Sequence, residues 1–331
     1  MRFGVRVPAT HPIRDVVGLV RRAEAAGFDA AWFPDSHLNY REVWTTLGAV
    51  AVSTDRIQIG PTVTNLVSRH VTVTASAARA VAEAAPGRFL LGLGAGDSAI
   101  GFDGMRNSNL RQMAEGVERL RRLMAGDGVA FGDFEAKLRG AHNPAPIYIA
   151  GSGPKTLAMA GAIADGVIIM MGNVARKLEH VRRGAAEAGR EAPPVHVYTT
   201  GALVDDLERV SRQFKTACIR LAELEGPGIF EEAGLPAPLI GDHVMGAAGD
   251  LGHAANIAEA TAAVDHRVTD EAALWFAKTY VIVGSEADVE AHLTKLRALG
   301  IAGVTMTQHS ANQLPDKLID TLGPLTRKFA G

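Results

Sequence analysis

The chain has 331 residues, of which 34 are Lys or Arg and 36 are Asp or Glu, so its formal net charge is −2. This balance argues against nucleic acid or an anionic membrane as a partner, because proteins that bind either usually carry a basic patch. Cys218 is the only cysteine, which excludes an intrachain disulfide and a cysteine-rich metal site. The opening MRFGVRVP lacks the apolar core of a signal peptide, and no run approaches a membrane span, so we expect a cytoplasmic protein.

Short apolar runs alternate with amphipathic stretches of helical period along the whole chain, as buried parallel strands and their helices do. The expected strands are Phe3–Val7, Ala30–Pro34, Ile57–Val63, Phe89–Gly94, Ile147–Ala150, Gly166–Met170, Val195–Thr200 and Val304–Thr307. The expected helices include Ile13–Ala26, Val43–Ser53, Val71–Ala84, Leu110–Ala125, Lys155–Ala164 and Val174–Ala188. Eight strands in one unbroken βα alternation, with no linker, predict an α/β fold, a single (β/α)₈ TIM-barrel domain over residues 1–331.

Two stretches interrupt this alternation. Residues 127–146 contain aromatics, glycines and two prolines, which predict a loop insertion before the fifth strand. Residues 226–252 are rich in Gly and Pro, with helical sequence on either side. Long loops that follow barrel strands lie on the catalytic face, so the second insertion is either a substrate lid or a solvated loop.

The best candidate for a phosphate site is the segment from Ala150 to Thr156, which joins a strand to a helix. Gly151, Ser152 and Gly153 let backbone N–H groups approach an anion, and the helix that begins at Pro154 adds the positive end of its dipole. The spacing is not that of a Walker P-loop. A tight turn with a serine cap would favour the same residues, so both interpretations stay open.

Two further strand ends carry unusual residues. The run Gly92-Leu93-Gly94-Ala95-Gly96-Asp97 ends the fourth strand, but it lacks the G-x-G-x-x-G spacing of a dinucleotide site. Its small residues leave room for a flat ring, and Asp97 is either a pocket residue or a helix cap. Pro61 removes a ladder donor near the end of the third strand, which predicts a distorted strand end there.

The second strand ends in Trp32-Phe33-Pro34-Asp35-Ser36-His37. A carboxylate and an imidazole two residues apart can supply acid and base groups near neutral pH. The alternative is that Asp35 caps a turn and His37 is solvated. The remaining histidines show no metal-ligand spacing, so we expect no metal site.

These segments, in this order, resemble the bacterial luciferase-like superfamily and, more narrowly, its methylenetetrahydromethanopterin reductase branch. The resemblance covers most of the chain and is weakest across about 205–275. It rests on an ordered set of loose motifs: MRFGV from Met1, AEAAGFDAAW from Ala23, Asp35 with His37, GPTVTN from Gly60, Arg69-His70, PGR from Pro86, GLGAGD from Gly92, GSGPK from Gly151, ADGV from Ala164 and GSEADV from Gly284.

The resemblance implies a barrel with insertions, usually dimeric, that binds FMN or the deazaflavin coenzyme F420 at the carboxyl-terminal face. It places a non-prolyl cis peptide at Thr62–Val63, behind the ring, and has Thr64 and Asn65 touch the ring. The cofactor phosphate would lie on Gly151, Ser152 and Gly153, ahead of Pro154. Asp35, Gly96 and Asp97 would line the pocket.

One position departs from this branch, which carries a glutamate on the first strand that has been proposed as an acid/base group. The matching residue here is Arg6, which cannot give up its proton at working pH. We therefore expect Arg6 to bind an anionic group of the substrate or the cofactor, and we place Arg6 and Arg69 among the substrate-binding residues. This departure puts a methylene-pterin substrate in doubt.

The leading hypothesis is an oxidoreductase that transfers a hydride between coenzyme F420 and a small organic substrate, with His37 and Asp97 as the proton-transfer groups. The first alternative is an FMN-dependent monooxygenase that receives reduced flavin from a separate flavin reductase and reacts it with oxygen. The second is a barrel that binds a flavin or deazaflavin without turnover. We expect a homodimer in each case.

Overall fold

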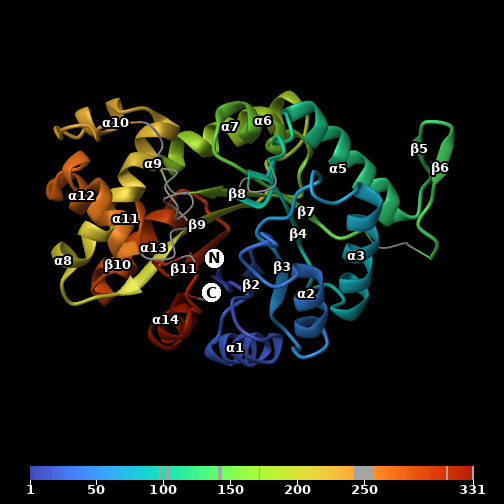
Figure 1. Ribbon diagram of the computed structural model, residues 1–331, viewed down its shortest axis with the longest axis horizontal. Coiled ribbons are helices and arrows are strands. Elements are labelled where there is room, and N and C mark those ends of the chain that lie inside the picture. The colour runs from blue at the N-terminus through green and yellow to red at the C-terminus, as the bar shows by residue number, and fades with distance from the viewer. Residues whose placement is uncertain are drawn as a thin grey trace.

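The computed structural model describes residues 1–96, 98–101, 104–140, 144–170, 172–241, 257–310 and 312–329. Eight parallel strands form a ring at its centre (Figure 1). They are β1 (Arg2–Arg6), β2 (Ala30–Phe33), β3 (Gln58–Pro61), β4 (Leu91–Leu93), β7 (Ile147–Gly151), β8 (Gly166–Met170), β9 (Val195–Leu203) and β11 (Gly303–Thr307). Each lies within a residue or a few of its predicted bounds. The predicted (β/α)₈ barrel is therefore confirmed.

The strands follow one another around the ring in the order β3-β2-β1-β11-β9-β8-β7-β4. β3 and β4, at the two ends of this path, are joined by two parallel bridges, between Ile59 and Phe89 and between Thr64 and Leu93. We call this junction the β3–β4 seam. It closes the barrel.

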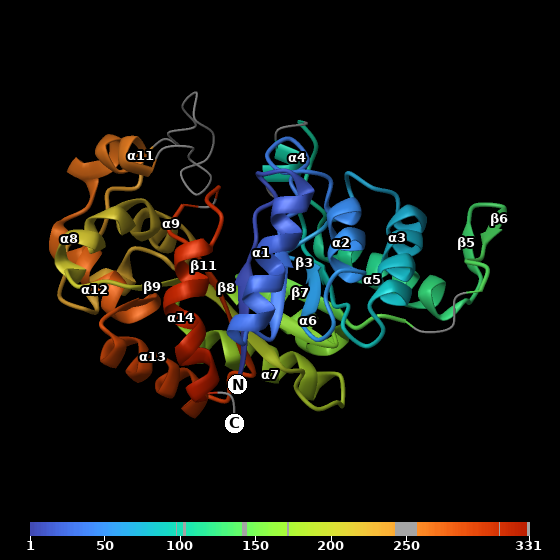
Figure 2. The same cartoon turned by 90° about the horizontal axis from the view of Figure 1, so that it is seen from below.

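Helices cover the outside of the ring (Figures 1 and 2). They are α1 (Ile13–Ala26), α2 (Val43–Ala51), α3 (Val71–Ala84), α5 (Leu110–Ala125), α6 (Pro154–Ile163), α7 (Val174–Glu187), α13 (Glu286–Ala298) and α14 (Asp316–Phe329), with the short α4 (Ser98–Gly101) after β4. α1 shows why the pattern was readable: it buries Val16, Leu19, Val20 and Ala23 on one face and ends at Gly27, whose φ is 106°. None of the helices among the described residues is long and apolar enough to cross a membrane.

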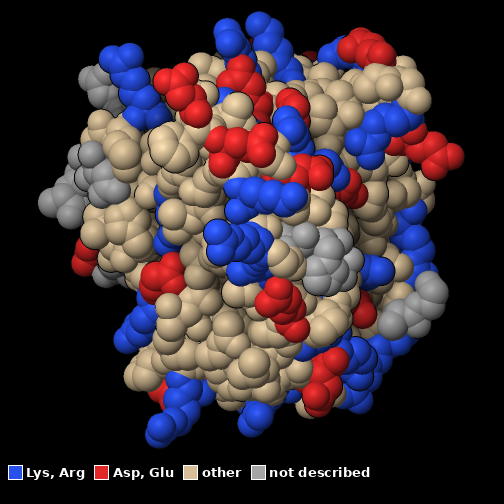
Figure 3. Space-filling view, turned by 90° about the vertical axis from the view of Figure 1, so that its right-hand side faces the viewer, with Lys and Arg blue, Asp and Glu red and all other residues tan. Residues whose placement is uncertain are grey.

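The insertion at 127–146 contains a hairpin rather than only a loop. Strands β5 (Val129–Phe131) and β6 (Phe134–Ala136) pair antiparallel, with Phe131 opposite Phe134, so a two-residue turn joins them. The hairpin projects from the barrel (Figure 1), and the Phe131 ring lies 5.2 Å from that of His70. On the face of the molecule that carries it, acidic and basic side chains are interspersed (Figure 3).

A helical lobe separates β9 from the strand that returns to it (Figure 1). It comprises α8 (Leu207–Ser211), a 3₁₀ turn (Arg212–Phe214), α9 (Lys215–Glu225), α10 (Gly228–Glu231), α11 (Ile257–Val264), a second 3₁₀ turn (Asp265–Arg267) and α12 (Asp270–Tyr280), and β10 (Ile282–Gly284) then pairs with the end of β9. The lobe has its own core, which includes Phe214, Cys218, Phe230 and Phe276. The insertion predicted at 226–252 lies within this lobe; residues 242–252 are outside the described residues.

The interior of the barrel is packed with side chains from alternate strand positions, including Trp32, Tyr148 and Ile168. His196, on β9, lies with its ring edge-on to that of Tyr148, with 5.3 Å between the ring centroids. Burial, with a smaller effect from the charge of Arg2, lowers the pKa of His196 to about 4. A neutral imidazole is thus part of the folded interior.

His196 should make the fold sensitive to acid. In the unfolded chain a histidine titrates near pH 6.5, whereas the folded pKa is about 4, so the unfolded state takes up the proton first as the pH falls. Burial of the neutral His196 therefore costs no stability above pH 6.5. The free energy of unfolding then falls as the pH drops from 6.5 toward 4. We expect His196→Gln to reduce the drop in unfolding free energy between pH 7 and pH 4.5 by about 2–3 kcal/mol. Urea unfolding at both pH values tests this, and an unchanged drop would contradict it.

Candidate active site

The carboxyl ends of all barrel strands open on one face, so residues that follow different strands meet there. Arg6 ends β1, Asp35 follows β2, and Thr62 to Asn65 follow β3. Gly96 follows β4, and Gly151 ends β7. The fold therefore brings these predicted site residues to one mouth.

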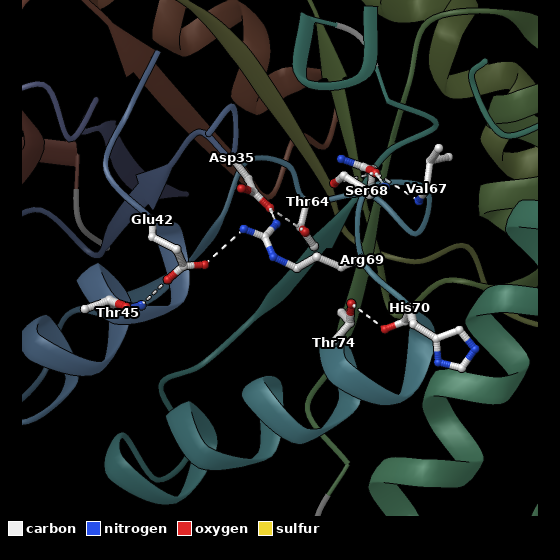
Figure 4. A network of polar contacts seen from close by, with 10 residues as sticks. Asp35, Glu42, Thr45, Thr64, Val67, Ser68, Arg69, His70 and Thr74 are labelled. Atoms are coloured by element: carbon white, nitrogen blue, oxygen red, sulfur yellow. Dashed lines mark hydrogen bonds and ion pairs between the residues drawn. The ribbon is translucent and has the colours of Figure 1, made fainter. Parts of the chain in front are cut away.

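Asp35 is the centre of a polar network at this mouth (Figure 4). Its Oδ2 accepts a hydrogen bond from the Thr64 hydroxyl at 2.7 Å and pairs with Nη1 of Arg69 at 2.5 Å. The Asp35 side chain is only 2% exposed and that of Arg69 17%. One carboxylate oxygen therefore fixes both the end of β3 and the loop that follows it.

The other side of the Arg69 guanidinium binds a second carboxylate. Its Nη2 lies 3.0 Å from Oε1 of Glu42, whose Oε2 accepts from the backbone N–H of Thr45 and so caps α2. The positive charge of Arg69 is thus shared between two carboxylates of the protein. The assignment of Arg69 to substrate binding stays a prediction, and this pairing reduces its attraction for an external anion.

The loop after β3 has the predicted backbone geometry: the peptide bond between Thr62 and Val63 is cis. Thr62 and Val63 are half-buried, whereas Thr64 is 0% and Asn65 2% exposed. The Asn65 side-chain oxygen accepts from the backbone N–H groups of Val67 and Ser68, so it shapes the turn. Thr62 and Val63 are thus the accessible part of this loop, whereas Thr64 and Asn65, which the resemblance has touch the ring, are buried. Their contact with a ring stays a prediction.

Arg6 lies beneath the mouth among phenol groups. Its Nη2 donates to the Tyr40 hydroxyl at 3.0 Å, and that hydroxyl donates to Oδ1 of Asn312 at 3.1 Å. Burial acts to lower the pKa of Arg6, but Tyr198 and Tyr40 outweigh it, and the net pKa is raised. Arg6 therefore stays charged at any working pH. The sequence offered no signal for Tyr40 or Asn312, because neither belongs to a motif.

The segment from Gly151 to Pro154 forms the junction between β7 and α6, as predicted. Gly153 is the N-cap of α6 with no side-chain cap, and Pro154 stands in the first turn. Ser152 therefore does not act as the helix cap that the alternative interpretation required. An uncapped helix N-terminus presents unsatisfied N–H donors and the positive end of the dipole, so this junction suits an anionic group.

The two predicted proton-transfer residues have different outcomes. His37 is exposed in the turn after β2, so it is accessible from solvent. Asp97 lies outside the described residues. The structure thus leaves the proton-transfer assignment as a prediction. No group of three or more His, Cys, Asp or Glu that could hold a metal occurs in the described part of the chain.

A buried ion pair that the sequence did not reveal joins the barrel to the helical lobe. Nζ of Lys177, on α7, lies 2.9 Å from Oε1 of Glu225, the last residue of α9, and the two side chains are 5% and 8% exposed. Lys177 also donates to the carbonyl of Met170, at the end of β8, and Glu225 accepts from the backbone N–H of Asn173. The pair therefore holds the β8–α7 loop and the lobe together beside the mouth.

The solved structures include barrels of the same form. The coenzyme F420 dependent tetrahydromethanopterin reductase from Methanopyrus kandleri superposes with a TM-score of 0.73, at 22% identity, over 97% of each chain. At that identity the likeness shows the fold alone. The architecture and the polar carboxyl-terminal mouth are those of a (β/α)₈ barrel enzyme with a helical insertion.

The chain belongs to the luciferase-like monooxygenase family, whose model matches residues 1–303. It is 30% identical over 332 residues to the 5,10-methylenetetrahydromethanopterin reductase of Archaeoglobus fulgidus, covering 96% of this chain and 95% of the relative. It is 29% identical over 317 residues to the reductase of the same name from Methanolobus tindarius, covering 92% and 93%. The resemblance drawn from the sequence motifs is confirmed.

Breaking the Lys177–Glu225 pair should destabilise the protein. Glu225→Gln leaves the Lys177 ammonium buried beside a neutral amide. Removing one charge of a buried pair typically lowers the free energy of unfolding by about 3–5 kcal/mol. The double variant Lys177→Met with Glu225→Gln removes both charges and should recover much of this loss. Urea unfolding of both variants tests the pair, and a double variant less stable than Glu225→Gln would contradict it.

The exposed pair of Arg111 and Glu115 on α5 provides the matched control, with side chains 86% and 45% exposed. Solvent screens such pairs and they contribute little. Glu115→Gln should therefore leave the unfolding midpoint unchanged.

Proposed function

We propose that this protein is an oxidoreductase that uses coenzyme F420 and transfers a hydride between the deazaflavin and a small organic substrate at the barrel mouth. The observation that carries the proposal is that the half-buried Thr62–Val63 segment, with its cis peptide, and the uncapped N-terminus of α6 both follow strands that end at this mouth. The first suits a flat ring and the second an anionic group. Two relatives that match nearly the full chain are named as reductases. The M. kandleri neighbour, a reductase of similar name, is described as coenzyme F420 dependent.

The residues present fit such a cofactor. Gly151, Ser152 and Gly153 would hold its phosphate with backbone N–H groups, and a Cβ at Gly153 would meet open space, so nothing crowds the approach. Thr62 and Val63 would back the ring. When bound, the deazaflavin supplies or accepts two electrons as a hydride. The protein's part is to orient the substrate against the ring and to move a proton, for which His37 is the accessible candidate.

The family description names a monooxygenase, which favours one alternative, a monooxygenase that uses FMN. Titration of the purified protein with F420 and with FMN, followed by fluorescence, separates the two. We expect F420 to bind at least about tenfold more tightly, a difference of about 1.4 kcal/mol. Tight binding of FMN alone would favour the monooxygenase, and binding of neither would refute both proposals. Binding of F420 without its oxidation or reduction across a panel of alcohols, aldehydes and ketones would indicate a carrier.

A single position tests the anion site. Asp and Asn are both good N-caps, so Gly153→Asp and Gly153→Asn should each leave α6 intact. Only the aspartate places a negative charge where the phosphate would lie. At a few ångströms this repulsion amounts to about 1–4 kcal/mol, which predicts a loss of F420 affinity of about tenfold or more for Gly153→Asp and little loss for Gly153→Asn. Equal affinities for the two variants would place the phosphate elsewhere.

A further inference from the structure

We infer that Asp35 is a positioning residue, which shapes the cofactor surface through Thr64 and not by touching the ligand. The inference rests on the proposed function for its ligand, but its structural part concerns the protein alone. The contacts around the β3–β4 seam carry it: Asp35 follows β2, yet its side chain binds Thr64 and Arg69, which lie beyond β3.

The β3–β4 seam is the sparsest junction of the ring. Two pairs of backbone hydrogen bonds span it. At the lower bridge, Ile59 donates to Arg88 and accepts from Leu90. At the upper bridge, next to the mouth, Thr64 donates to the carbonyl of Gly92 and accepts from the N–H of Gly94. The mouth end of the seam thus depends on Thr64.

The backbones of the two strands approach so closely at this seam that no side chain fits between them. A Cβ at Gly60 would lie 2.0 Å from the carbonyl oxygen of Leu90, and one at Gly92 would lie 2.1 Å from that of Pro61. Glycine is required at both positions, because any other residue would push the strands apart. Side-chain support for Thr64 must therefore come from outside the seam.

Asp35 provides that support. The hydrogen bond from the Thr64 hydroxyl to its carboxylate is charge-assisted, and the Arg69 guanidinium binds the same oxygen (Figure 4). The Asp35 side chain is 2% exposed and Thr64 is fully buried. Both side chains are therefore almost entirely withdrawn from the surface of the mouth. Val63, the residue before Thr64, is half-buried and packs against Gly94, so a shift of Thr64 moves the accessible surface.

The experiment is a double-variant cycle on F420 affinity. Thr64→Val removes the hydroxyl and keeps the shape, and Asp35→Asn removes the charge and keeps the shape. If Asp35 acts through Thr64, each variant weakens F420 binding by a similar factor, about fivefold or more. The double variant then binds F420 no more weakly than the single variant with the lower affinity. An affinity lost in Asp35→Asn but kept in Thr64→Val, or losses that multiply in the double variant, would show that Asp35 acts on the ligand independently.

Hydrogen exchange gives a second measurement that needs no ligand. We expect faster exchange of the Thr64 and Gly94 amides in both variants, while the Ile59 and Leu90 amides at the lower bridge keep their protection. Unchanged exchange at Thr64 and Gly94 would overturn the inference even if F420 binds. If the wild-type protein binds no F420, the proposed function fails, and exchange at the seam still decides the role of Asp35.

A buried threonine far from the mouth controls for general destabilisation. Thr326 on α14 is 1% exposed and its hydroxyl donates to the carbonyl of Gly323. Thr326→Val should keep both the affinity for F420 and the exchange rates at the seam. A loss of affinity in this variant equal to that in Thr64→Val would assign the effect to overall stability and overturn the inference.

Discussion

The close approach of β3 and β4 is the constraint on which the rest of the site depends. A barrel must close, and here it closes where two glycine backbones lie against the carbonyl groups of the facing strand. The segment that continues from this seam, from Thr62 to Asn65, is part of the mouth. The same segment therefore closes the barrel and shapes the mouth, and the Asp35 network supports it.

The charged groups around the mouth mostly bind one another. Arg69 lies between Asp35 and Glu42, and Lys177 is buried against Glu225. Backbone polarity at the start of α6 is available to an anionic ligand as well. This explains how a chain with a net charge of −2 can suit a phosphate-bearing cofactor without a basic patch.

Much of the fold was readable from the sequence because its signals are local. The bounds of α1 follow from apolar spacing and from the glycine after its last turn, and the strands follow from short apolar runs between helices. The helical lobe was harder to anticipate. Its core joins residues as distant as Phe214 and Phe276, and no short-range pattern marks such a pairing. The hairpin before β7 was also missed, since two three-residue strands leave too little alternation to recognise.

The sequence by itself determined the barrel, the order of the strand-end motifs and the family, because each depends on local periodicity or on motifs in a fixed order. Only the tertiary structure decided what the individual polar residues do. Asp35 and Arg69, 34 positions apart, form a pair, and Thr64 turns inward while Val63 remains accessible. Lys177 meets Glu225 across 48 positions. The physical reason is that burial and pairing are properties of packed neighbours, and strands far apart in the chain become neighbours only when the barrel closes.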